Sequence, residues 1–518
     1  MSKTPYLTAP QKLTTMPPGI PYIIGNEAAE RFNFYGMRAI LVVFMTKYLV
    51  DHTGAAAPMS ETDANYWFHI FLASNYFFPA LGAIISDAFW GKYKTIIWLS
   101  LVYCLGSIVL ALDQTRLGLF AGLGLIALGA GGIKPCVSAH VGDQFSSGNQ
   151  HLVSRAFGWF YFSVNFGSFF SIMLIPWLLE NYGARWAFGF PAVLMLIAAL
   201  VFWMGRYRYA HIPPRRDSFQ LDFFRFIGIA IAAGLGGGFW MKFSDGNGWK
   251  FFSAPALAGL IVISGGIFWG LHRLLPRVVV TPEVRDGWRL LGRLSLLFVF
   301  VAVFWSLWDQ SGSEWVLQAE KMDRNFLGFE WLSSQIQAVN AIMILAFIPL
   351  FQYVIYPAIN KVFPLNPLRK IGIGLVVTGL SFLVSGWIES QLAAGQTPNI
   401  GWQMPAYALL SAGEVMVSIT ALEFAYTQSP VHMKSIIMSL YLLSISAGNL
   451  FTALVYVFIK NDDGSLKLHG AAYYNFYAFL SIGCVALWVF VARRYKEKTY
   501  FQGEAPVADA KAESTTSA

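Results

Sequence analysis

Eight charged side chains stand inside or at the edge of long apolar stretches of this sequence, where charge is expensive. They are Glu27, Glu30, Arg31, Arg38, Lys134, Asp309, Glu414 and Glu423. If they faced lipid, at about 2.5–3.5 kcal/mol each, they would cost on the order of 20 kcal/mol together. They must therefore face one another or water. The acids outnumber the bases, so some carboxylates lack a basic partner and should hold a proton part of the time, as coupling to protons requires.

The first apolar stretch predicts a helix with a charged stripe along one face. At 100° per residue, Glu30, Arg31, Phe34 and Arg38 all lie within roughly 60° of Glu27, and the stripe is about 16 Å long. In a local interpretation, Glu27 and Arg31 only satisfy each other, since they are four residues apart. Arg38 has no such neighbour, so it needs an acid from another helix or an anionic ligand.

Other polar residues in apolar stretches are more ambiguous. His69 and Tyr76 are seven residues apart and share a helix face. Imidazole suits a switch near neutral pH, although a lone histidine between apolar helices is more often packed and satisfied. Glu423 follows Glu414 by nine residues, which places it about 180° around the helix. We expect a structural role for Glu423.

The elements that position these residues must be membrane helices. The chain has 518 residues, 56% of hydrophobic and 12% of charged types, with a mean hydropathy of +0.53. Soluble domains carry about one quarter charged residues, so a soluble enzyme is excluded. No GxSxG or HExxH string occurs, which argues against a membrane enzyme. The charges form no repeated ring, which argues against a channel.

Charge and cysteine usage imply no nucleic acid, metal or cofactor. A net charge of +8 would suggest a nucleic-acid partner in a soluble protein, but here the bases mark loops. Cys104, Cys136 and Cys484 lie in apolar or glycine-rich stretches without metal-ligand spacing, and we expect them to be small core residues. The first 21 residues contain no apolar core of a cleavable signal peptide.

Fourteen apolar runs have the length of a membrane span. They are residues 21–49, 64–87, 94–112, 116–139, 156–179, 186–206, 221–243, 251–272, 288–310, 332–356, 370–388, 401–427, 433–459 and 472–493. Lysines and arginines gather in alternate loops, so both termini are predicted to be cytoplasmic. Setting aside the pair at 221–272 leaves six spans on each side, which predicts two halves with a site between them at mid-membrane.

This organisation predicts five segments. Residues 1–20 form a cytoplasmic N-terminal segment, and residues 21–210 an N-terminal six-helix bundle. Residues 211–285 form a linker with two extra transmembrane helices, residues 286–495 a C-terminal six-helix bundle, and residues 496–518 a disordered cytoplasmic tail. The predicted fold is an all-α polytopic membrane protein.

Three separated strings resemble the signatures of the proton-dependent oligopeptide transporters, a branch of the major facilitator superfamily. Residues 27–36 read EAAERFNFYG, residues 160–168 read FYFSVNFGS, and residues 413–430 read GEVMVSITALEFAYTQSP. The resemblance covers about residues 20–495 and implies the major facilitator fold. It further implies a proton-coupled symporter that imports di- and tripeptides by alternating access, with protons as the coupling ion.

The resemblance also implies a setting for the protein. The inserted pair of helices resembles the additional hairpin of prokaryotic members, and the short connection near residues 389–400 lacks the large external domain of animal members. A bacterial form in the cytoplasmic (inner) membrane, surrounded by the lipid bilayer and functional as a monomer, is therefore expected.

Residue roles follow from the resemblance, motif by motif. The implied peptide-binding residues are Arg38, Tyr35, Tyr76, Lys134, Asn165, Asn340, Glu414, Ser418 and Trp305, with Trp402 as a further candidate wall. Arg38 and Lys134 would meet the peptide carboxylate and Glu414 its amino group. For both tryptophans, packing or interfacial anchoring is at least as good an explanation.

Proton coupling is implied for Glu27, Glu30, Arg31, His69, Asp309 and Glu414, and Arg38 with Asp309 resembles the pair that closes the outer side. Protonation of a glutamate would free Arg31 or Lys134 for the peptide carboxylate.

One departure from the family pattern concerns the tyrosine pair of the first motif. This sequence has Phe34 before Tyr35, where the family commonly has two tyrosines, so a hydroxyl is missing from the charged face. A second hypothesis keeps the fold and changes the cargo, because relatives carry nitrate, plant metabolites or drugs. Nitrate needs only cations and has no use for Glu414, so the presence of that acid favours a zwitterion.

Overall fold

The computed structural model describes residues 6–214, 282–428, 434–461 and 466–495. The predicted spans at 221–243 and 251–272, and the predicted tail at 496–518, lie outside the described residues. The other twelve predicted spans each correspond to a helix or to a run of helical segments.

Six long helices form the N-terminal half. They are α1 (Ile20–Lys47), α2 (Glu61–Ile85), α3 (Lys92–Leu112), α4 (Arg116–Gly142), α5 (Val153–Tyr182) and α6 (Ala184–Met204). Their starts follow local sequence signals: Ser60 accepts a hydrogen bond from the Asp63 amide at the start of α2, and Thr115 accepts one from the Gly118 amide at the start of α4.

The C-terminal half is more broken. It contains α9 (Pro282–Trp308), α10 (Glu314–Glu320), α11 (Ala338–Leu350), α12 (Tyr356–Asn360), α13 (Pro367–Ala393), α14 (Gln403–Glu414), α15 (Thr420–Thr427), α16 (Lys434–Ile459) and α17 (Ala471–Arg494). A π-helical turn, Phe351–Ile355, joins α11 to α12, and another, Val415–Ile419, joins α14 to α15. A two-residue hairpin, β1 (Asn325–Phe326) with β2 (Phe329–Glu330), follows α10 and is a small exception to the all-α prediction.

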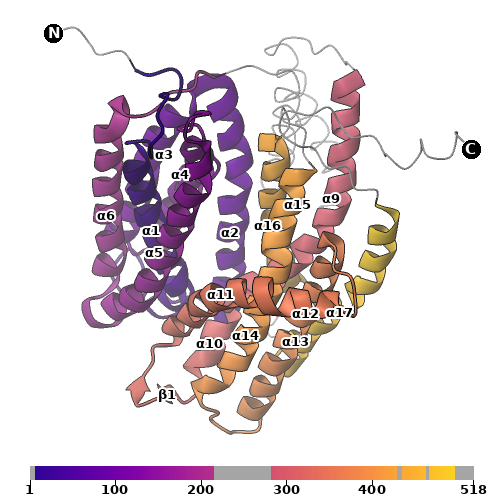
Figure 1. Ribbon diagram of the computed structural model, residues 1–518. Helices are drawn as coiled ribbons and strands as arrows, with labels where there is room; N and C mark the ends of the chain where they lie inside the picture. The colour runs from indigo at the N-terminus through magenta and orange to yellow at the C-terminus, as the bar shows by residue number, and fades with distance from the viewer. Residues whose placement is uncertain (1–5, 215–281, 429–433, 462–465, 496–518) are drawn as a thin grey trace, which may run out of the picture.

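The two halves have separate apolar cores and lie side by side (Figure 1). Phe34, Phe44 and Phe188 belong to the core of the N-terminal half. Phe304 and Trp488 belong to that of the C-terminal half. The halves meet where α2 packs along α16 and α5 contacts α11.

Hydropathy separates ten of the helical segments from the rest. Within the described residues, ten are long and apolar enough to cross a membrane. Helices α1 and α2 have comparable lengths of 28 and 25 residues, but polar and charged side chains lower their hydropathy. Those side chains include Glu27, Glu30, Arg31 and Arg38 of α1 and His69 of α2.

Candidate functional site

A cavity of about 460 Å³ lies between the two halves. Helices α1, α2 and α5 supply one wall, and α9, α11, α14 and the π-helical turn after it supply the other. The lining includes Tyr35, Arg38, Tyr76, Tyr161, Asn165, Trp305, Trp308, Asn340, Tyr407, Glu414 and Ser418. The volume is in the range of about 300–1,000 Å³ of small-molecule sites.

Opposite charges enter this cavity from opposite halves. Arg38 comes from α1 and Glu414 from the end of α14. Glu414 Oε2 accepts hydrogen bonds from Trp308 Nε1 at 2.7 Å and from Asn340 Nδ2 at 2.9 Å. The ion pairs among the described residues do not include Glu414. It is therefore an acid with neutral donors, available to a cation in the cavity.

A π-helical turn begins directly after Glu414. Such turns are rare, and they frequently occur at functional sites because they displace the ladder of backbone hydrogen bonds. Ser418 lies in this turn, lines the cavity and shares a hydrogen bond of 2.9 Å with Tyr441. Glu414 and Ser418 therefore lie on one wall of the cavity.

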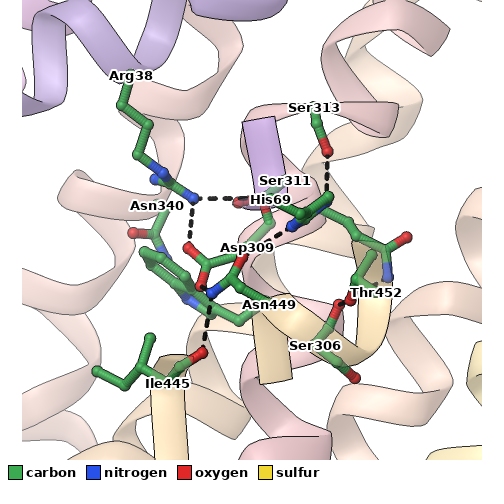
Figure 2. A network of polar contacts seen from close by, with 12 residues as sticks. Arg38, His69, Ser306, Asp309, Ser311, Ser313, Asn340, Ile445, Asn449 and Thr452 are labelled. Carbon is green, nitrogen blue, oxygen red and sulfur yellow. Dashed lines mark hydrogen bonds and ion pairs between the residues drawn. The ribbon is translucent and has the colours of Figure 1, made fainter. Parts of the chain in front are cut away.

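A network of polar contacts joins the halves beside the cavity (Figure 2). Arg38 Nη2 donates to Asp309 Oδ1 at 3.0 Å, and the other carboxylate oxygen accepts from Asn449 Nδ2 at 2.6 Å. The guanidinium also lies 4.7 Å from the Trp308 ring centroid. Arg38 and Asp309 are 5% and 1% exposed, so this ion pair is buried.

His69 continues the network on the side away from Arg38. One ring nitrogen, Nδ1, lies 2.8 Å from Asn449 Oδ1, and the other, Nε2, lies 3.1 Å from Ser313 Oγ. Both nitrogens of this fully buried ring are therefore satisfied. Asn449 bridges His69 to Asp309, and it comes from α16, far from both in sequence.

The charged stripe of α1 extends away from the cavity. Arg31 Nε lies 2.7 Å from Glu27 Oε1 and 3.1 Å from Glu30 Oε2. The local pair between Glu27 and Arg31 therefore forms, as the local interpretation expects. One arginine serves two carboxylates, and its contact with Glu30 is an ion pair without hydrogen-bond geometry, so neither oxygen of Glu30 accepts a hydrogen bond from the described residues.

Lys134 lies against the same helix but does not line the cavity. Its Nζ is 4.0 Å from the Phe34 ring centroid and 4.1 Å from that of Tyr76. Within the described chain, this buried ammonium has no hydrogen-bond partner. Phe34 thus faces a cation, and a tyrosine there would place a hydroxyl beside Lys134.

The two tryptophans that were candidates for the cavity wall differ in their position. Trp305 lines the cavity, with its ring centroid 5.4 Å from that of Trp308. Trp402 does not line it: this residue is 51% exposed and packs on Trp387 at 5.0 Å, because it belongs to the short turn before α14. Glu423 is also exposed and outside the cavity.

A belt of polar contacts seals the molecule beyond the Arg38 network, and we call this region the sealed end. Exposed ion pairs cross between the halves there: Lys47 with Glu320, Lys321 with Glu61 at 3.0 Å, and Lys460 with Asp63 at 2.8 Å. Gln335 also donates to the backbone oxygen of Met173 at 2.9 Å. The structure is thus closed on this side of the cavity.

Several residues of the site were not predicted. Trp308, Tyr161, Tyr407 and Asn449 belong to the cavity or the network, and Glu314 belongs to the sealed end. Asn449 had a usable signal, since it is an asparagine in an apolar span. Among the described residues, no group of three His, Cys, Asp or Glu residues could hold a metal ion.

Comparisons with known proteins agree with this architecture. A model of the POT family (PTR2) matches residues 93–473. Peptide transporter family 1 of Drosophila melanogaster is 37% identical over 393 residues, 73% of this chain and 48% of that protein. Solute carrier family 15 member 2 of Homo sapiens is 33% identical over 421 residues, 78% of this chain and 53% of that protein. The chain spans about half the length of these relatives.

Solved structures match over nearly their whole length. The crystal structure of an auto inhibited POT family peptide transporter has a TM-score of 0.79 at 37% identity and covers 94% of this chain and 99% of that one. That of the POT family transporter PepTSo has a TM-score of 0.78 at 39% identity and covers 92% and 98%. The family model matches most of the chain, and these solved structures share its helical arrangement. The chain therefore belongs to the POT family, a group of multi-pass membrane transporters with the major facilitator fold.

Proposed function

We propose that this protein is a proton-coupled symporter that imports di- and tripeptides by alternating access. The observation that carries the proposal is the cavity between the halves, with Arg38 on one wall and Glu414 on the other. A zwitterionic peptide backbone has a carboxylate and an ammonium at its two ends, and opposite charges on the two walls of the cavity complement both. The neutral lining between them tolerates varied side chains.

Proton coupling is proposed for the carboxylates that lack a full complement of cations. Arg31 is shared between Glu27 and Glu30, so protonation of either acid changes how this arginine is held. Lys134, whose ammonium lies over the Phe34 and Tyr76 rings without a hydrogen-bond partner among the described residues, is a cation that a peptide carboxylate or an ionised Glu30 would stabilise. Proton and peptide would then be coupled through shared cations. His69 and Asp309 are proposed to take part through the buried network.

We further propose that the protein lies in the cytoplasmic (inner) membrane as a monomer. Both of its termini would then lie in the cytoplasm. The sealed end then faces outward, and the structure represents the outward-closed state. Arg155, Arg206 and Arg208, together with Lys361, Arg369, Arg493 and Arg494, lie in loops or helix ends on the other side, as the positive-inside rule requires. The five-segment division of the chain and the absence of a cofactor remain part of this proposal.

The decisive experiment is uptake of labelled di-alanine into liposomes that contain the purified full-length protein, with and without an inward proton gradient. Di-alanine capped at its amino end serves as the competitor. We expect gradient-dependent accumulation that the capped peptide inhibits poorly, because the cap removes the ammonium that Glu414 would bind. Without accumulation by folded protein, the peptide proposal fails, and other anions and zwitterions should be screened against the same gradient.

A further inference from the structure

The sealed end contains a carboxylate that the proposed function does not use. Glu314 is the first residue of α10, directly after the Ser313 that contacts His69. Its Oε1 accepts a hydrogen bond from Asn65 Nδ2 at 2.8 Å and another from the Tyr456 hydroxyl at 2.6 Å. Asn65 belongs to the N-terminal half and Tyr456 to the C-terminal half, so Glu314 joins the two halves.

The charged groups around Glu314 are engaged elsewhere. Lys321 pairs with Glu61 at 3.0 Å, and Glu389 accepts from Gln318 Nε2 at 2.9 Å. From α17, the Tyr473 hydroxyl donates to that of Tyr456, and the Tyr474 hydroxyl donates to the backbone oxygen of Glu314. His69 approaches this residue through Ser313, and also through Tyr456, on whose ring it stacks with 6.3 Å between the centroids. The ion pairs of the described residues therefore leave Glu314 without a cation.

The two oxygens of this carboxyl group are treated differently. Both donors point to Oε1, and no donor of the described residues reaches Oε2. A neutral carboxylic acid has this pattern, since its carbonyl oxygen accepts two hydrogen bonds and its other oxygen carries the proton. Asn65, Tyr456 and Tyr473 are at most 4% exposed and Glu314 itself is half-buried, so closure of the halves removes part of the water around Glu314 without supplying a positive charge. An ionised carboxylate is unfavourable in that position.

We propose that Glu314 is a proton-operated latch of the sealed end. In the open state, water hydrates its ionised carboxylate, which opposes closure. When Oε2 takes up a proton from the outer solution, Asn65 can cover the neutral acid and the halves can close. The proton leaves again when the halves separate, so it sets the position of the gate and is not itself carried. This inference rests on the alternating-access cycle proposed above.

The test measures the gate directly, by electron-spin distances between labels at Thr53 and Leu327. These exposed positions lie on the N-terminal and the C-terminal half. The labels are placed in full-length protein whose three cysteines are replaced by serine, reconstituted in lipid bilayers. Glu314→Gln keeps a carbonyl oxygen for Asn65 and Tyr456 and cannot ionise. At about pH 9 we expect the closed-to-open ratio of the variant to exceed that of the wild type. The excess should be about tenfold for each pH unit by which closure shifts the midpoint of Glu314 protonation.

At about pH 3, below the ordinary pKa of about 4.3 of a glutamate side chain, the wild-type carboxyl group is protonated in both states, and the variant and the wild type should coincide. Equal ratios at both pH values, or a variant that is more open at high pH, would overturn the proposal. Glu330→Gln is the matched control, because Glu330 pairs with Arg324 inside one half and is 65% exposed. It should follow the wild type at every pH.

A second variant keeps the inference testable if Glu314→Gln does not fold. Tyr456→Phe removes a donor that favours the ionised form of Glu314, so the pH at which the gate opens should rise. An unchanged or lower opening pH would contradict the latch. Because these measurements do not require transport, failure of di-alanine uptake by the wild type would remove the proposed cargo and leave the latch result standing.

Discussion

The buried pair between Arg38 and Asp309 should contribute more to closure of the sealed end than any one of the three exposed ion pairs there. Asp309→Asn removes the charge and keeps an oxygen to which Arg38 can donate. In the closed state, the guanidinium then stays buried, with 5% of the residue exposed, and without a counter-charge. Removal of one partner from a buried pair costs about 3–5 kcal/mol.

The magnitude follows from the difference between the two states. Arg38 becomes hydrated when the halves separate, so the cost is confined to the closed state and favours opening. Because the retained hydrogen bond offsets part of the cost, we take the lower value of about 3 kcal/mol, which is roughly a 100-fold shift toward the open state. An exposed pair contributes about 0–1 kcal/mol. Lys460→Met, which breaks the pair with Asp63, should therefore change the ratio by less than about fivefold.

Spin-label distances between Thr53 and Leu327 measure this shift in the same bilayers. At a pH near neutrality, we expect a large open population in Asp309→Asn and a nearly unchanged open population in Lys460→Met. If Lys460→Met opened the gate as much as Asp309→Asn, burial would not decide the strength of these pairs, and the reasoning would be refuted.

Four further predictions concern the site and the fold. Glu414→Gln should lower uptake of di-alanine by about 10- to 100-fold, since a hydrogen bond to a charged group contributes about 1.5–3 kcal/mol; unchanged uptake would show that the ammonium binds elsewhere. Glu30→Gln, and likewise Glu27→Gln, should stop gradient-driven accumulation and leave peptide exchange partly intact, and persistent accumulation in both variants would refute the coupling role. Trp305→Ala should weaken peptide binding measured by thermal shift, whereas Trp402→Ala, outside the cavity, should leave it unchanged; equal effects would contradict the assignment. Gly131→Ala should destabilise the protein by about 1–3 kcal/mol in thermal unfolding, because a Cβ there would overlap Phe78, whereas Gly124→Ala on the same helix meets nothing within 4 Å and serves as the control.

The helices were predictable because membrane spans are long and apolar. The expected span at 370–388 lies within α13 (Pro367–Ala393), and that at 472–493 corresponds to α17 (Ala471–Arg494). Hydropathy fixes these segments without any knowledge of their neighbours. The π-helical turns were not predictable in this way, since the backbone departs from α-helical hydrogen bonding for tertiary reasons. One of them begins directly after Glu414.

Without the family resemblance, the site was predictable only where one helix carries several of its residues. Glu27, Glu30 and Arg31 are near neighbours on α1, so helical periodicity alone places them on one face. The partners of His69 come from distant parts of the chain: Asn449 from α16 and Ser313 from the segment before α10. A single sequence contains no information on that packing. Glu314 was missed because it lies past the predicted end of the span at 288–310.

Protonation of Asp309 and protonation of Glu314 should have opposite effects on the same gate. A proton on Asp309 removes the counter-charge of buried Arg38, so protonation there favours opening. A proton on Glu314, which has no cation among the described residues, removes the cost of burying an anion, so protonation there favours closure. The closed population should therefore pass through a maximum as the outer pH falls, provided that Glu314 binds its proton first. Asp309→Asn should leave only the rising limb of that curve, and Glu314→Gln only the falling one. If the closed population of the wild type only rose or only fell as the pH is lowered, one of the two carboxyl groups would not titrate over that pH range.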